Sequence, residues 1–134
     1  MTKGEVIIAV GRRKTGVASV FLTKGKGKIL VNKTPINEHF TSEKDKIKWM
    51  KPFFVAGISN PEQSFSADVK LSGSGVSGQV GALALGFSKA LAIVMPEIRS
   101  SLRKQGLLTR DSRMVERKKP YLRKARKAPQ YSKR

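Results

Sequence analysis

Four stretches of the chain have the apolar patterns of β-strands, and in the last of them apolar and polar residues alternate strictly, as in a half-buried strand. These stretches are residues 5–10, 16–23, 28–32 and 64–72. Glycine-containing links at residues 11–15 and 24–28 favour tight hairpins between the first three. In the fourth, Ser66, Asp68 and Lys70 share the polar face, which we expect to contact solvent or RNA. The pattern therefore predicts a small four-stranded sheet.

Helical patterns fill the gaps between and after these strands. They span residues 34–40, 42–54, 78–94 and 96–106. Thr34 before Pro35, and Ser42 three residues before Asp45, resemble helix starts, and Pro52 should end or bend the second helix. Apolar residues at three- and four-residue steps give the third helix a face for the sheet. This order of elements predicts an α+β fold in which a four-stranded sheet packs on helices.

The pattern changes at Gly106, a residue type that commonly ends helices. Beyond it the chain has few large apolar residues and a cation at nearly every third position. Such a segment cannot bury enough surface to offset the entropy of ordering. We therefore expect a globular body over residues 1–105 and a basic C-terminal tail over residues 106–134 that becomes ordered on a partner.

The charge balance indicates what that partner is. The 134 residues include 28 Lys and Arg against 9 Asp and Glu, which gives a net charge of +19, and the tail is the most densely charged part. A small protein with this charge is expected to bind a polyanion. The chain has no cysteine, which excludes disulfides and thiolate metal sites. The N-terminal apolar run is too short for a signal peptide and no segment approaches membrane-spanning length, so we expect a cytoplasmic protein without a membrane partner.

The glycines of residues 73–78 match the spacing G-x-G-x-x-G of dinucleotide-binding turns. The strand before them alternates, whereas a dinucleotide fold begins with a strand that is buried on both faces. Such a fold also needs an acidic residue at the end of a second strand, and the candidate, Glu97, follows no strand. We therefore expect no cofactor. Gly81 and Gly86 are expected to bring the helix close to the sheet. The start of this helix can instead bind a phosphate of a nucleic acid through the backbone amides of Ser77, Gly78, Gln79 and Val80.

No residue pattern indicates catalysis. His39 is the only histidine, the carboxylates are scattered, and no nucleophile stands beside a base. We expect neither an enzyme nor a metal site. Trp49, Phe53 and Phe54 are expected to make core contacts rather than to form a platform on which bases stack.

The body carries two short basic segments in its predicted hairpin tips. Solvated turns are one interpretation of them. Because the whole chain is strongly basic, we favour contacts with RNA phosphates. The residues concerned are Arg12, Arg13, Lys14 and Lys26.

The tail carries the largest set of candidate RNA contacts. Arg110, Arg113 and Arg117 lie at steps of three and four, so they would share one face of a helix formed on binding. Tyr121 and Tyr131 are interspersed among further cations, a combination that suits irregular RNA with unstacked bases. Those cations are Lys118, Lys119, Arg123, Lys124, Arg126 and Lys127. A disordered tail that serves solubility or localisation is the alternative.

Five stretches of the chain, taken in order, resemble the family of the ninth protein of the small ribosomal subunit. They are GRRKTGVASVFL, GKGKILVN, SGSGVSGQVGALALGFSKAL, LRKQGLLTRDSRMVERKK and LRKARKAPQYSKR. The resemblance runs nearly end to end, and its most specific part is TRDSRMVERKK together with the final SKR.

This resemblance implies an α+β body like the second domain of ribosomal protein five, bound to ribosomal RNA in the head of the small subunit beside neighbouring ribosomal proteins. It implies that the tail extends towards the decoding region, where Ser132, Lys133 and Arg134 approach the anticodon stem-loop of the transfer RNA in the peptidyl site. It implies a structural role in translation on cytoplasmic ribosomes, without cofactor or small-molecule substrate. Because no transit segment is visible, we expect a bacterial rather than an organellar ribosome. Two alternatives stay open: another basic protein that coats nucleic acid, and a nucleotide-dependent enzyme that uses the glycine turn.

Overall fold

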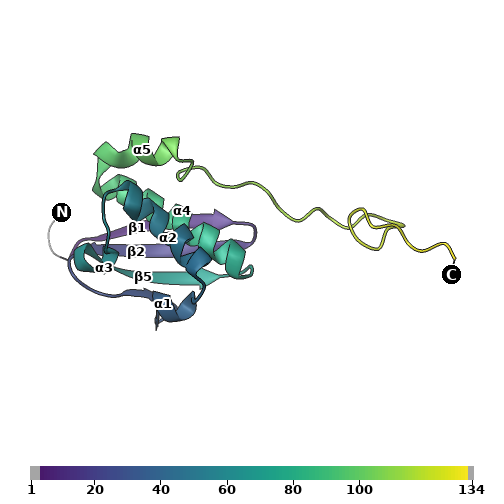
Figure 1. Ribbon diagram of the computed structural model, residues 1–134, viewed down its shortest axis with the longest axis horizontal. Coiled ribbons are helices and arrows are strands. Elements are labelled where there is room, and N and C mark those ends of the chain that lie inside the picture. The colour runs from purple at the N-terminus through teal and green to yellow at the C-terminus, as the bar shows by residue number, and fades with distance from the viewer. Residues whose placement is uncertain (1–3, 133–134) are drawn as a thin grey trace.

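The computed structural model describes residues 4–132. Figure 1 shows a body of helices and strands from which a long tail extends. In chain order the elements are β1 (Val6–Arg13), β2 (Gly16–Lys24), β3 (Ile29–Val31), β4 (Thr34–Pro35), α1 (Ile36–His39), α2 (Glu43–Val55), α3 (Pro61–Ser64), β5 (Phe65–Ser72), α4 (Val76–Val94), the 3-10 helix η1 (Pro96–Ile98) and α5 (Arg99–Lys104). The fold is therefore α+β, as predicted.

The sheet has five strands rather than the predicted four, in the order β1-β2-β5-β3-β4. The additional strand is β4, which pairs with β3 in antiparallel fashion. Asn32 and Lys33 have φ values of 50° and 69°, which turns the chain back so that Thr34 and Pro35 lie beside β3. These two residues, which the sequence pattern assigned to a helix start, therefore belong to the sheet, and α1 begins at Ile36.

The place of β3 corrects a second expectation. Residues 24–28 do not form a hairpin, because β3 pairs with β5 in parallel rather than with β2. The link crosses the end of β5 and is held there by two backbone hydrogen bonds, from Gly25 to Ser64 O (2.9 Å) and from Gly27 to Glu62 O (3.0 Å). A three-residue strand has too little local pattern to select its neighbour, so its position depends on burying Ile29 in the core.

The core lies between the sheet and helices α2 and α4, which cover one of its faces (Figure 1). The predicted alternation in β5 is confirmed, since Phe65, Ala67, Val69 and Leu71 are all buried. Close approach of α4 to the sheet is confirmed at Gly86, where an added Cβ would lie 2.8 Å from Val20 Cγ2. The other helical glycine that we singled out, Gly81, instead makes room for the side chain of Arg13 in β1.

Helix α2 contributes an aromatic cluster to this core. Trp49 and Phe53 are buried, with ring centroids 6.2 and 5.0 Å from that of Phe87 in α4. The expected core role is wrong for Phe54, which is 53% exposed on the other side of the helix. Ser42 precedes α2 without a side-chain capping bond, and the helix continues through Pro52 to Val55 rather than ending at the proline.

Helix α4 spans 19 residues and is apolar enough to cross a membrane by length and composition, which corrects the expectation that no segment reaches such a length. Most of it is buried inside the body, where it packs on β1, β2 and α2. Its apolar character is that of the central helix of a folded core.

Candidate nucleic-acid interface

Three segments that are far apart in the sequence meet at one end of the body: the β1–β2 turn, the loop between β5 and α4, and the start of the tail. Gly73 has a φ of +72° and lies against the carbonyl of Thr15, so that a side chain would collide with the turn. Gly16, at the other side of the turn, packs against Ser74. The β1–β2 turn is thus fixed against the start of α4.

Basic side chains from two of these segments gather at this end. Arg12 is exposed, and Lys14 forms the turn itself with a φ of 51°. Arg110 from the tail donates a hydrogen bond to Lys14 O at 3.4 Å. The structure therefore brings Arg12, Lys14 and Arg110 together, although almost a hundred residues separate the last two in sequence.

Arg13 is placed differently from its neighbours. Its side chain is only 22% exposed, its Nη2 lies 3.5 Å from Asp111 Oδ2, and its buried Nε has no hydrogen-bond partner among the described residues. A phosphate would reach this guanidinium less readily than that of Arg12.

The start of α4 supplies a smaller set of amides than the sequence suggested. The first hydrogen bond within the helix turn runs from the Gln79 amide to Gly75 O (2.9 Å), so the Gln79 amide is not available to a ligand and neither is that of Val80 behind it. The amides before this bond are those of Val76, Ser77 and Gly78. The Gln79 side chain closes the turn by donating from Nε2 to Gly73 O at 3.3 Å.

The glycines of this turn have separate structural roles. Gly78 is buried, and an added Cβ would lie 2.8 Å from Ser74 Cβ, so packing alone requires glycine there. Gly75 is exposed with nothing within 4 Å of an added Cβ, which leaves open space in front of the helix start. A phosphate can approach the positive end of the helix dipole through this space.

Lys26 lies away from the other basic residues of the body. It belongs to the link that follows β2, whereas the Lys14 turn precedes β2, so the two lie at opposite ends of a nine-residue strand. Lys26 is exposed. Any contact that it makes with RNA therefore belongs to a second surface.

The tail leaves the body near this end and runs away from it (Figure 1). Gly106, with a φ of +72°, ends α5 as expected, and Leu107 and Leu108 still pack against the core. Residues 109–132 form neither helix nor strand. The helical face expected for the first three tail arginines is therefore absent in the free chain, and its formation on RNA stays a prediction.

The rest of the tail presents its side chains outward. Tyr121 and Tyr131 are 95% and 99% exposed. Glu116 pairs with Lys119 and with Arg126, the latter at 3.0 Å, and so draws part of the tail into a loop. The exposed cations without a salt bridge among the described residues are Arg117, Lys118, Arg123, Lys124 and Lys127. Ser132 accepts a hydrogen bond from Gln130, while Lys133 and Arg134 lie outside the described residues.

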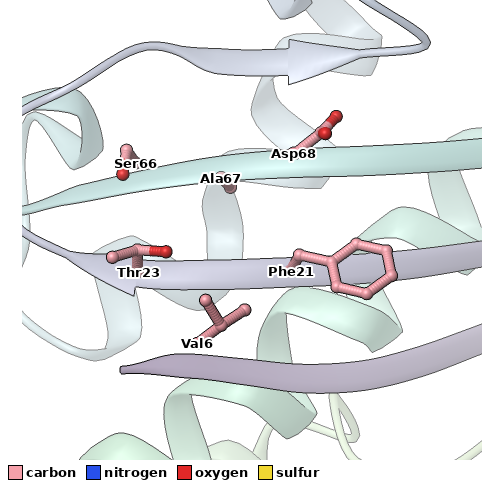
Figure 2. A pocket seen from close by; sticks show the side chains of 6 residues that line it. All are labelled: Val6, Phe21, Thr23, Ser66, Ala67 and Asp68. Atoms are coloured by element: carbon pink, nitrogen blue, oxygen red, sulfur yellow. The ribbon is translucent and has the colours of Figure 1, made fainter. Parts of the chain in front are cut away.

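The open face of the sheet carries a shallow depression (Figure 2). Phe21 and Thr23 come from β2, and Ser66 and Asp68 from the predicted polar face of β5. Lys70 Nζ lies 5.7 Å from the centroid of the Phe21 ring, a cation–π contact. The side chains around the depression include no nucleophile paired with a base, and residues 4–132 contain no group of three or more acidic, His or Cys side chains that could hold a metal ion.

Sequence reasoning missed one residue of this region, Asp111. Arg113 donates to both of its carboxylate oxygens, from Nε at 3.0 and 3.1 Å and from Nη2 at 2.6 Å. These side-chain bonds, and to a smaller extent a bond from the Arg113 amide, hold the pKa of Asp111 well below its usual range. The contact with Asp111 in turn raises the pKa of Arg113. The available signal was that Asp111 is one of only two carboxylates in a strongly cationic segment.

A compact α+β body that exposes basic residues at one end and extends a long cationic tail is typical of proteins that bind nucleic acid. Comparison with known proteins agrees with this class. The family model described as ribosomal protein S9/S16 matches residues 11–134, and the chain belongs to this family.

Relatives from three bacteria cover nearly the whole chain, and each is named small ribosomal subunit protein uS9. The chain is 49% identical to the protein of Chlorobaculum tepidum over 130 residues, which is 97% of this chain and 98% of the relative. It is 46% identical to that of Dehalococcoides mccartyi over 132 residues, which is 98% of each chain. It is 47% identical to that of Cytophaga hutchinsonii over 130 residues, which is 97% of this chain and 99% of the relative.

Proposed function

We propose that the body, residues 1–105, anchors this protein in ribosomal RNA of the small-subunit head, and that the tail, residues 106–134, reaches the anticodon stem-loop of the transfer RNA in the peptidyl site. As a member of its family, the protein is a structural, non-enzymatic constituent of the small ribosomal subunit and acts on the ribosome in the cytoplasm. Both alternatives that the sequence left open are superseded by this assignment.

The observation that carries the proposal is the exit of the exposed cationic tail from the end of the body where Arg12, Lys14 and the start of α4 meet. We assign the body contacts with ribosomal RNA to this end, including Ser77 and Gly78 of the helix start. Arg13 and Gln79 lie within the same surface but support its shape as well. Lys26 would contact RNA on a separate surface.

The tail acts by neutralising phosphates where RNA strands crowd together. Each Lys or Arg that reaches a phosphate displaces condensed counterions, which favours binding without reading the base sequence. Tyr121 and Tyr131 expose their rings to unstacked bases. The tail cations proposed for ribosomal RNA are Arg110, Arg113, Arg117, Lys118, Lys119, Arg123, Lys124, Arg126 and Lys127.

At the end of the tail, Ser132, Lys133 and Arg134 are proposed to contact transfer RNA. A guanidinium binds phosphate oxygens in bidentate fashion irrespective of the bases attached to them. Such a contact suits a site that must accept every transfer RNA in turn.

Crosslinking in cells tests both contacts at once. The RNA attached to the full chain is identified, and the measurement is repeated after deletion of residues 132–134. The control variant K44Q/K46Q loses the same side-chain charge from α2, outside the proposed interface. We expect the deletion to remove transfer RNA crosslinks and to keep those with ribosomal RNA, while the control keeps both. Transfer RNA crosslinks that persist after the deletion would refute the role of the C-terminal residues.

A further inference from the structure

The start of the tail is bound to the body through the carboxylate of Asp111. Asp111 lies between two guanidinium groups, that of Arg13 in β1, 3.5 Å away, and that of Arg113, which binds it through two nitrogens. The backbone amide of Arg113 donates to the same carboxylate at 3.0 Å. Arg110 adds a hydrogen bond to the carbonyl of Lys14 in the β1–β2 turn. We refer to Arg13, Asp111 and Arg113 as the tail clamp.

The body holds its part of the clamp rigidly. The Arg13 side chain lies across the backbone of α4 at Gly81, where an added Cβ would lie 2.9 Å from Arg13 Nη1. Gly81 thus leaves room for the Arg13 side chain in this position. Because Arg13 is largely buried and confined by the helix, its guanidinium has a fixed direction in which to meet a partner.

The tail begins its course at a fixed point as well. Gly106 ends α5, and Leu107 and Leu108 pack against the core, so Asp111 follows a short anchored segment. Beyond Arg113 the side chains of Met114 and Val115 are 60% and 86% exposed. The clamp is therefore the last polar contact between the body and the tail among the described residues. Met114 and Val115 still lie beside Arg13 and Lys14, and the chain then runs free of the body (Figure 1).

The charge of Asp111 works against RNA binding, because it neutralises guanidinium charge that could otherwise face phosphates. The tail contains only two acidic residues, and both bind tail cations. Within the described residues, only Asp111 also binds the body. A carboxylate at this position can favour RNA binding only by fixing the conformation of the tail, because its charge opposes binding.

From this geometry we infer that Asp111 is a positioning residue, which fixes the direction in which the tail leaves the body and thereby presents it to RNA in a preorganised form. The inference rests on the proposed function only where it concerns RNA. Preorganisation lowers the entropy lost on binding, so it strengthens binding without adding a contact.

The free protein provides the first test. Because the chain has no cysteine, I47C and V115C introduce a single pair of spin labels at exposed positions on α2 and in the tail. The clamp predicts a narrow distance distribution in this parent and an approximately twofold broader one in D111N. E116Q, which removes the other carboxylate of the tail, is expected to retain the parent width. Equal widths in the parent and D111N would overturn the inference.

Affinity for ribosomal RNA provides the second test, because the clamp and the change in net charge predict different affinities for the D111N variant. D111N and E116Q each raise the net charge by one, so electrostatics alone predicts that both bind RNA more tightly and to the same extent. The clamp predicts that D111N binds about fivefold more weakly than E116Q at the same salt concentration. Equal affinities of the two variants would show that the clamp does not prepare the tail for RNA.

The experiments distinguish failure of the proposed function from failure of the tail clamp. If deletion of residues 132–134 leaves transfer RNA crosslinks intact, the transfer RNA contact is wrong, whereas the label distances still report on the clamp in the free protein. If D111N leaves the distances unchanged, the clamp is wrong whatever the tail contacts.

Discussion

Gly11 in β1 and Gly86 in α4 face each other without side chains, so the backbone of the central helix lies directly on the sheet. A Cβ added at Gly11 would collide with the carbonyl of Ala82 and the amide of Gly86, which are backbone atoms that cannot turn aside. This approach places the start of α4 beside the β1–β2 turn. The geometry of the candidate interface therefore depends on a packing contact in the core.

Replacing Gly11 by alanine should destabilise the protein by about 1–3 kcal/mol, because the helix must move away from the strand. The control is Gly75→Ala, where the new methyl group meets nothing within 4 Å, and there we expect a change below about 1 kcal/mol. The measurement is the free energy of unfolding in urea for both variants. A stability loss at Gly75 equal to that at Gly11 would contradict the packing argument.

The sequence predicted those parts of the fold that depend on local pattern. Strand patterns of eight and nine residues identified β2 and β5, the latter by strict alternation, and three- and four-residue steps identified α4. It identified β3 as a strand but not its neighbour in the sheet, and it missed β4, because strands of three and two residues are positioned by long-range contacts. Phe54 was assigned to the core from its apolar character, but the turn of α2 directs it outward.

The candidate site was predictable to a similar extent. The concentration of basic residues in the tail and in the β1–β2 turn is visible in the sequence and predicts a polyanion partner, whereas the assignment to ribosomal RNA came from the resemblance to a family. The contact between Arg13 and Asp111 is not visible in the sequence, since these residues are separated by most of the chain and neither has a local signal for the other. Sequence reasoning assigned Arg13 to RNA, which stays a prediction, and did not reveal the structural contact that Arg13 makes with Asp111.

The tail clamp should be insensitive to pH across the neutral range. The pKa of Asp111 is lowered by its bonds from Arg113, so the contribution of the clamp is complete above the ordinary carboxyl pKa and is lost only as the pH falls through the lowered value. We expect the label distances between positions 47 and 115 to stay constant from about pH 8 to about pH 5. Broadening centred between pH 6 and 7, on the order of a histidine pKa, would show that another group controls the tail.

The C-terminal arginine should not be replaceable by lysine. Arg134→Lys keeps the charge but loses the fork of donors that binds two phosphate oxygens, so we expect transfer RNA to leave the peptidyl site about fivefold faster. Lys133→Arg is the matched control, since it also keeps the charge and should leave the rate unchanged or slower. Dissociation rates from ribosomes carrying each variant provide the measurement. Equal rates for Arg134→Lys and the parent would show that charge alone is required.

The central claim is that the tail binds RNA by neutralising phosphates, and the salt dependence of RNA affinity tests it most directly. If six to ten phosphates are engaged, affinity should fall by roughly 10³ to 10⁵ between 50 and 200 mM salt. The variant K118Q/K124Q/K127Q should reduce the slope of log affinity against log salt by about 2 to 3, whereas K44Q/K46Q/K48Q on α2, with the same loss of charge, should leave it nearly unchanged. Equal slopes for the two triple variants would contradict the claim.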